Sequence, residues 1–326
     1  MKQVLGAACG LVIAGLVLAG CASAPAPSDP ESFSRQAVLD MTRELSRDSL
    51  FGRAPDTDGS RRAQELITTR MREIGLETVG GGYRHIFDLS DFTDRPEGAG
   101  PAEDKTGTNL IGYLPGRSND MATLVITAHY DHVGVREGQI YNGADDNASG
   151  VATMLAVAEY FAAQPPRHNI LFVAFDAEEG GFKGSLAFVK HPPIPEHWIV
   201  ANLNFDMVSR GENGGLWASG THHWPVFTPL LEKIAPDAPI GLHMGYDGAD
   251  PDQDDWTGQS DHIAFFRKGI PHLYLGVEDH PDYHKPTDDF SNIQPDVFLA
   301  AVETALMIAI AMDEDLEEIA EHRAVD

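Results

Sequence analysis

The stretch "TLVITAHYDHVGV" at residues 123–135 begins with a short apolar run and ends with two histidines around one aspartate. Short runs rich in β-branched residues, without polar alternation, are typical of strands that are buried on both faces. Three further runs of this kind follow at 169–179, 197–206 and 271–277. The four runs therefore predict a buried, largely parallel sheet.

Apolar residues at three- and four-residue steps predict helices in the remaining sequence. The predicted helices are 33–46, 60–75, 150–163 and 296–312. Alternation of strands with helices predicts one α/β domain, whose mixed, mostly parallel sheet is covered by helices on both faces. The Gly-, Asp- and Pro-rich stretch 80–108 is predicted to be an irregular surface excursion, and the acidic tail to residue 326 is expected to fray.

The N-terminus resembles a bacterial lipoprotein signal. One lysine precedes an apolar, Gly-rich stretch in residues 1–20, which is short for a membrane span and fits a secretory signal better. "LAGC" at 18–21 resembles a lipobox, which implies a lipidated Cys21 at the cell envelope. Ala22 favours the outer membrane, facing the periplasm. A Pro/Ala/Ser-rich tether at 21–32 would then lead into a domain at 33–326.

The formal net charge of −27 disfavours nucleic acid as a partner, because phosphates would be repelled. Only two cysteines occur in the chain. Cys9 would leave with the signal and Cys21 would carry lipid, so no disulfide is expected. Stability must then come from the apolar core, from bound metal, or from both.

Metal-binding residue types follow each predicted strand. Parallel sheets place ligands at the carboxyl ends of their strands. The residues found there are His129, Glu178, Glu179, Asp206 and His284, with Asp145 and Asp146 in the turn before the helix at 150. Imidazole and carboxylate without cysteine are typical of catalytic zinc. Since one catalytic zinc needs three protein ligands, this larger set suggests two ions.

Three roles follow from position along the chain. Asp145, between Gly143 and Gly150, is the natural bridge between two ions. Asp131 would share a face with His129 and accept a hydrogen bond from the far ring nitrogen. Glu178 and Glu179 are adjacent and diverge, so that one can bind metal while the other acts as general base.

Six motifs occur in the same order as in the co-catalytic di-zinc aminopeptidases of metallopeptidase family 28, which also includes glutamate carboxypeptidase relatives. They are "AHYDH", "NGADDNASG", "DAEEGG", "NFDM", "SDH" and "YHKPTD", and the resemblance runs from about residue 35 to 310. It implies two Zn²⁺ bridged by Asp145. His129 and Asp206 would complete one metal, and Glu179 and His284 the other. Glu178 would be the general acid/base, and Asp131 the partner of His129.

Two further features follow from the resemblance. A cis peptide is expected within the paired aspartates, at Asp145–Asp146. The 78 residues that separate Asp206 from His284 leave no room for a large inserted lid or dimerisation domain. One departure is that no tyrosine precedes "SDH" in "DDWTGQSDH", so the donor to the developing oxyanion stays unassigned.

The resemblance implies an aminopeptidase acting on peptides with a free N-terminus, with Glu178 deprotonating the attacking water. The acidic segment 247–255 would either help to hold the substrate ammonium or form a solvated loop. A carboxypeptidase or dipeptidase is the main alternative, with Arg210, Arg267 or Lys268 as the cation for a substrate carboxylate. A single-zinc glutaminyl cyclase and a non-catalytic binding domain are further alternatives. The preferred N-terminal residue and the oligomeric state are left open.

Overall fold

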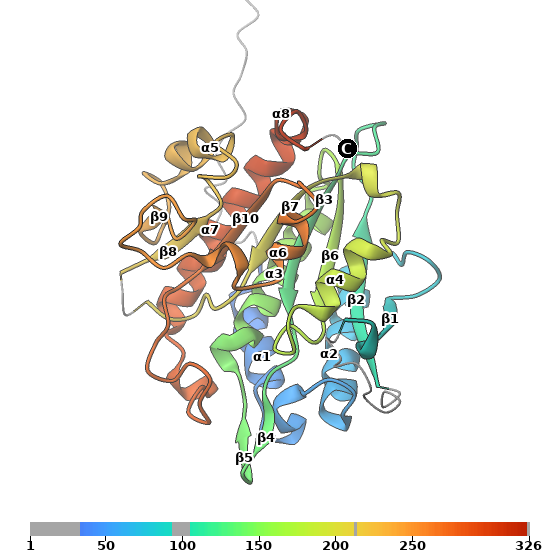
Figure 1. The fold of residues 1–326 in the computed structure, drawn as a ribbon, viewed down its shortest axis with the longest axis vertical. Helices are drawn as coiled ribbons and strands as arrows, with labels where there is room; N and C mark the ends of the chain where they lie inside the picture. Colours follow the sequence, from blue (N-terminus) through green and yellow to red (C-terminus); the bar gives the residue numbers. More distant parts are fainter. Residues whose placement is uncertain (1–32, 93–104, 212–213, 325–326) are drawn as a thin grey trace, which may run out of the picture.

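An eight-stranded sheet crosses the protein in the order β1-β2-β6-β3-β7-β10-β8-β9 (Figure 1). This computed structural model describes residues 33–92, 105–211 and 214–324. The strands of the sheet are β1 (Arg84–Asp88), β2 (Thr106–Leu114), β3 (Thr123–His129), β6 (Asn169–Phe175), β7 (Ile199–Phe205), β8 (Leu216–Ser219), β9 (Leu242–Met244) and β10 (His272–Gly276). A separate hairpin of β4 (Gly134–Arg136) and β5 (Gln139–Tyr141) projects at the bottom of Figure 1.

The four central strands, β6, β3, β7 and β10, are parallel to one another. β2 is antiparallel to β6, and β8 is antiparallel to β10. The predicted mixed, mostly parallel sheet is therefore confirmed, and its four predicted strands are the four central ones. Because these strands are parallel, all four carboxyl ends meet at one edge of the sheet.

Helices cover both faces of the sheet (Figure 1). They are α1 (Arg35–Leu45), α2 (Asp58–Ile74), α3 (Gly150–Ala163), α4 (Lys183–Lys190), α5 (Phe227–Ile234), α6 (His262–Phe266), α7 (Pro295–Glu314) and α8 (Leu316–Ala320). The alternating residues of β3 show the two faces. Leu124 and Ile126 belong to the apolar cluster that includes residues of α1, α2, α3 and α7, whereas Val125 belongs to the cluster that includes residues of α4 and α6. Helix α2 ends at Gly75, as predicted, in the left-handed conformation with φ 93°.

Helix α7 is long and apolar enough to cross a membrane by length and composition. In the fold it is a core helix, because Phe298, Val302, Ala305 and Ala309 are buried in the main apolar cluster. Its apolar character therefore has a structural explanation in the packing against α3 and α5.

Two sequence predictions are wrong in detail. The stretch 80–108 contains β1 and the beginning of β2, which pair in antiparallel register. Strand β1 has only two apolar residues, Ile86 and Phe87, and Ile86 is exposed, so this edge strand resembles a loop in composition. The tail contains α8, whose Leu316 and Ile319 are buried in the core. The predicted signal segment, Cys21 and the tether lie outside the described residues.

Candidate metal centre

Polar side chains converge at the carboxyl ends of the four central strands. The contributing residues are His129 at the end of β3, Glu178 and Glu179 after β6, Asp206 after β7 and His284 after β10. Most of them line a pocket of ≈ 280 Å³, together with Asp146 from the turn before α3. The topology therefore brings together residues that are separated by up to about half of the chain.

His129, Asp146 and Asp206 form the first group of this site. His129 Nε2 lies 3.3 Å from Asp146 Oδ1 and 3.3 Å from Asp206 Oδ1. All three side chains are buried. Ligand atoms around a tetrahedral zinc lie about 3.3–3.6 Å apart, given Zn–N and Zn–O bonds of about 2.0–2.2 Å. The donor set and its spacing fit one zinc ion.

The second group uses the other oxygen of the same aspartate. His284 Nε2 lies 3.1 Å from Asp146 Oδ2 and 3.2 Å from Glu179 Oε2. His132 Nδ1 lies 2.6 Å from Glu179 Oε1. Burial opposes the shift, but these two histidines lower the pKa of Glu179 to about 2. Asp146 thus presents one oxygen to each group, which is the arrangement that a bridging carboxylate requires.

Two histidines lie beside Glu179, and their surroundings differ. His284 lines the open pocket, whereas His132 is buried with 1% of its surface exposed. His132 faces the Glu179 oxygen that His284 does not contact. Both histidines therefore lie within ligand distance of the second group: His132 forms a compact buried set with Asp146 and Glu179, and His284 contacts the same two carboxylates from the open pocket.

The prediction that Asp145 is the bridge is contradicted by the geometry. Its Oδ1 accepts hydrogen bonds from the backbone N–H and the hydroxyl of Ser209, both at 2.7 Å. Its Oδ2 accepts from His280 Nε2 at 3.1 Å. Both carboxylate oxygens of Asp145 are thus engaged by Ser209 and His280. Asp146 occupies the bridging position that was predicted for Asp145.

The turn 144–149 is fixed by neighbouring polar groups. Asp288 accepts hydrogen bonds from the backbone N–H groups of Asp145 and Asp146 at 2.9 and 3.0 Å. Asn147 donates from Nδ2 to the Phe205 carbonyl at 2.9 Å. The cis peptide is Asp146–Asn147, one residue beyond the predicted position. Both features predicted within the paired aspartates, the bridging carboxylate and the cis peptide, are thus displaced by one residue along the chain.

Asp131 supports both the histidine and the two glutamates. Its carboxylate accepts from the backbone N–H groups of Glu178 and Glu179 at 3.0 and 3.4 Å. His129 Nδ1 points to the Asp131 carbonyl at 3.2 Å, with the carboxylate at 3.7 Å. The far nitrogen of His129 thus meets the Asp131 carbonyl oxygen and not the predicted carboxylate, which lies beyond hydrogen-bond distance. Asp131 also holds the loop that carries Glu178.

Glu178 lines the pocket without joining either ligand group. Burial raises the pKa of Glu178 well above its usual range, although the nearby His129 opposes this shift. A carboxylate with a raised pKa is a stronger proton acceptor. Its environment thus suits a general base.

Arg53 is a buried support of the site that the sequence reasoning missed. The side chain is fully buried, and burial lowers its pKa to about 10. It donates from Nε to the Tyr130 carbonyl at 2.7 Å and from Nη2 to the Gly143 carbonyl at 3.0 Å. Arg53 thereby ties the loop after β3 to the turn that carries Asp146. Its sequence context carries no signal, because the partners that tie it to the site are backbone carbonyls 77 to 90 residues along the chain.

Polar residues in and near the acidic segment 247–255 have structural roles. In the acidic segment, Asp247 accepts hydrogen bonds from Gly220, Thr221 and His222. His262 is buried and contacts the Trp256 carbonyl at 2.9 Å. Tyr246 stacks on Trp256 with ring centroids 3.9 Å apart. None of these side chains belongs to either ligand group.

Cavity size does not locate the site. A hollow of ≈ 990 Å³ lies along α1 and α2, away from all the strand-end residues. Its wall carries ion-paired side chains such as Arg61 with Asp58 and Arg84 with Glu65. The smaller pocket is the candidate site because the metal-ligating side chains converge there.

The sequence model for peptidase family M28 matches residues 109–309. The chain belongs to peptidase family M28. Aminopeptidase YwaD of Bacillus subtilis is 29% identical over 263 residues, which cover 76% of this chain and 51% of that protein. A vacuolar membrane protease of Candida albicans is 32% identical over 279 residues, covering 82% of this chain and 30% of that protein. The chain thus spans about half or less of the length of these curated relatives.

Solved structures confirm the zinc-exopeptidase type of fold. A zinc aminopeptidase from Bacillus subtilis superposes with a TM-score of 0.67 at 18% identity, covering 85% of this chain and 95% of that one. Porphyromonas gingivalis glutaminyl cyclase superposes with a TM-score of 0.69 at 18% identity, covering 85% and 98%. The donor set fits zinc, and the relatives of this chain include a probable zinc metalloprotease of Pyricularia oryzae, 30% identical over 243 residues.

Proposed function

We propose that this protein is an aminopeptidase that uses two zinc ions to hydrolyse the N-terminal peptide bond of peptides. The observation that carries the proposal is the sharing of Asp146 by two ligand groups at the edge of an open pocket. His129 and Asp206 would complete one metal, and Glu179 and His284 the other. The family membership and the YwaD relative support the same reaction class.

When bound, zinc supplies Lewis acidity that polarises a carbonyl and lowers the pKa of water. Glu178 then takes a proton from the attacking water. The water oxygen bonds to the carbonyl carbon, the C–N bond breaks, and Glu178 returns the proton to the leaving amine. Asp131 keeps Glu178 in place through the loop backbone.

The pocket wall suits a substrate with a positive amino terminus and an apolar first side chain. Asp279 lines the pocket beside the ligand carboxylates, and its negative charge favours a nearby ammonium. Met207, Val277 and Trp256 supply apolar surface in the same wall. No tyrosine directly precedes the "SDH" motif, but Tyr283 lines the pocket, and burial raises the pKa of its hydroxyl. Its hydroxyl therefore stays protonated and can donate to a substrate oxygen.

The cations required by a carboxypeptidase are placed unfavourably. Arg210 donates from Nη1 to Asp282 at 3.0 Å and is buried, so its charge is engaged. Arg267 and Lys268 follow α6 and precede β10, at the amino-end edge of the sheet. Lys268 pairs there with Glu196 at 3.2 Å. These positions favour the aminopeptidase over the carboxypeptidase alternative.

Cleavage of matched peptides tests the proposal. We expect a peptide with a free N-terminus to lose its first residue, and the same peptide with an acetylated N-terminus to stay intact, because Asp279 and its neighbours recognise the ammonium. Mass spectrometry of the products is the measurement. Equal cleavage of the acetylated peptide would contradict the aminopeptidase assignment.

The glutaminyl cyclase alternative is tested in the same assay, since such an enzyme is a structural neighbour. A peptide that begins with glutamine would lose ammonia on cyclisation, whereas hydrolysis releases free glutamine. We expect free glutamine, because the site presents two ligand groups rather than one. The exported, lipid-anchored location stays a prediction from the N-terminal sequence.

A further inference from the structure

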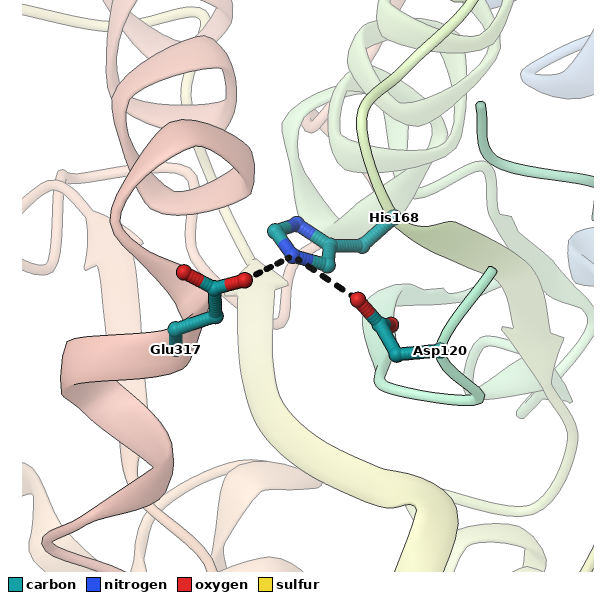
Figure 2. A group of neighbouring side chains, drawn as sticks. All are labelled: Asp120, His168 and Glu317. Atoms are coloured by element: carbon teal, nitrogen blue, oxygen red, sulfur yellow. Dashed lines mark ion pairs between the residues drawn. The ribbon is translucent and has the colours of Figure 1, made fainter. Parts of the chain in front are cut away.

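A second cluster of side chains that could hold a metal, drawn in Figure 2, consists of one histidine and two carboxylates. It lies at the amino ends of the central strands, across the sheet from the pocket. It consists of Asp120, before β3, His168, before β6, and Glu317 in α8. Residues Thr123 and Asn169 are partners in the parallel pairing of β3 with β6, which places the first two segments side by side. Since β3 rises by about 3.3 Å per residue, its seven residues separate this cluster from His129 by roughly 20 Å.

His168 is held in one orientation. Its side chain is 0% exposed. Its ring nitrogen Nδ1 lies 2.7 Å from the Asp313 carbonyl oxygen, which can only accept. The backbone N–H of His168 donates to Asp313 Oδ1 at 2.8 Å. Nδ1 therefore carries a hydrogen, and Nε2 is the nitrogen that can offer a lone pair. A backbone carbonyl on the far nitrogen is the usual support of a metal-binding histidine.

Nε2 faces the two carboxylates and has no hydrogen-bond partner. It lies 3.7 Å from Asp120 Oδ2 and 3.9 Å from Glu317 Oε1. Dashed lines in Figure 2 mark both pairs. Both distances exceed those of a hydrogen bond. A lone pair that faces two carboxylates is unfavourable unless a cation lies between them. The distances approach the spacing of about 3.3–3.6 Å between ligands of a tetrahedral zinc.

Each carboxylate is oriented by other contacts. Glu317 pairs through Oε2 with Arg167 at 2.7 Å, which leaves Oε1 toward His168. Asp120 accepts through Oδ1 from the Ala122 backbone N–H at 3.0 Å, and Oδ2, which also accepts from Ser118, faces the ring. Both carboxylates are exposed, so an ion and its waters can reach them.

We propose that His168, Asp120 and Glu317 form a distal binding site for a divalent transition-metal ion of the zinc class. Imidazole with two carboxylates is a donor set for such ions, and water would complete the coordination. The ion joins segments that are far apart in the sequence, and it fastens α8 to the amino-end edge of the sheet. Its role is structural, because the site lies across the sheet from the pocket.

Zinc binding to the full-length protein tests this site. The chelated protein is titrated with Zn²⁺ alone and bound zinc is counted per chain by elemental analysis. We expect Glu317→Gln and Asp120→Asn each to bind one equivalent less than wild type, or to bind it at least about tenfold more weakly. Glu318→Gln, an exposed change on the same helix, serves as the matched control and should bind as wild type does.

The readouts separate this site from the pocket. Peptide hydrolysis should be unchanged in Glu317→Gln, and zinc should raise the Tm of this variant less than that of wild type. The double variant Glu317→Gln/Asp146→Asn should bind one zinc equivalent less than Asp146→Asn alone. The distal site can therefore be tested even if the pocket binds no zinc. Unchanged zinc content and affinity in both distal variants would overturn the proposal. The positive charge between the two carboxylates would then be that of a protonated His168.

Discussion

The variant Glu178→Gln is expected to lose activity while keeping its zinc. General bases contribute about 10²- to 10⁴-fold to rate, so kcat should fall by that factor. Glutamine has the same shape and cannot take a proton from water. Because Glu178 lies outside both ligand groups, bound zinc per chain should equal that of wild type. The measurements are kcat on a free N-terminal peptide and zinc by elemental analysis.

Glu179→Gln is the matched control for this variant. It alters the neighbouring side chain, which lies 3.2 Å from His284 and belongs to the second ligand group. Its loss of activity should be accompanied by loss of zinc. Near-native turnover in Glu178→Gln, or zinc loss equal to that of Glu179→Gln, would show that Glu178 is not the base.

The paired aspartates should respond differently to the same change. Asp146→Asn removes the carboxylate that serves both ligand groups, and we expect zinc affinity and activity to fall by more than about 100-fold. Asp145→Asn should retain zinc, because its carboxylate binds Ser209 and His280 instead. One lost hydrogen bond in the buried turn should destabilise the fold by about 1–3 kcal/mol.

Zinc content, activity and Tm of the two variants, measured in parallel, decide between the aspartates. The two changes are chemically identical and adjacent, so each is the control of the other. Greater zinc loss in Asp145→Asn than in Asp146→Asn would restore the assignment made from the sequence.

The sheet and the strand ends could be predicted because both depend on local pattern. Buried parallel strands read as apolar runs, and their carboxyl ends must meet at one edge. His129, Glu179, Asp206 and His284 all lie at that edge, beside Glu178. This prediction depends only on the direction of the strands and not on the conformation of the loops that follow them.

The choice between Asp145 and Asp146 could not be made from the sequence. Both side chains are buried. Which of them faces His129 and His284 depends on the backbone torsions of an irregular turn, where Asp146 has φ −101° and ψ 93°. The roles of Arg53 and of the His168 cluster could not be predicted from the sequence for a related reason. Their partners come from segments far along the chain, and only the folded structure brings them together.

Removal of zinc tests the central claim most directly. The protein is stripped with a chelator, shown to be metal-free by elemental analysis, and assayed on a free N-terminal peptide before and after addition of Zn²⁺. The pocket geometry predicts that hydrolysis falls below about 1% of the initial rate and returns with zinc in wild type, but not in Asp146→Asn. A metal-free protein that cleaves the peptide at the initial rate would contradict a zinc-dependent peptidase at this site.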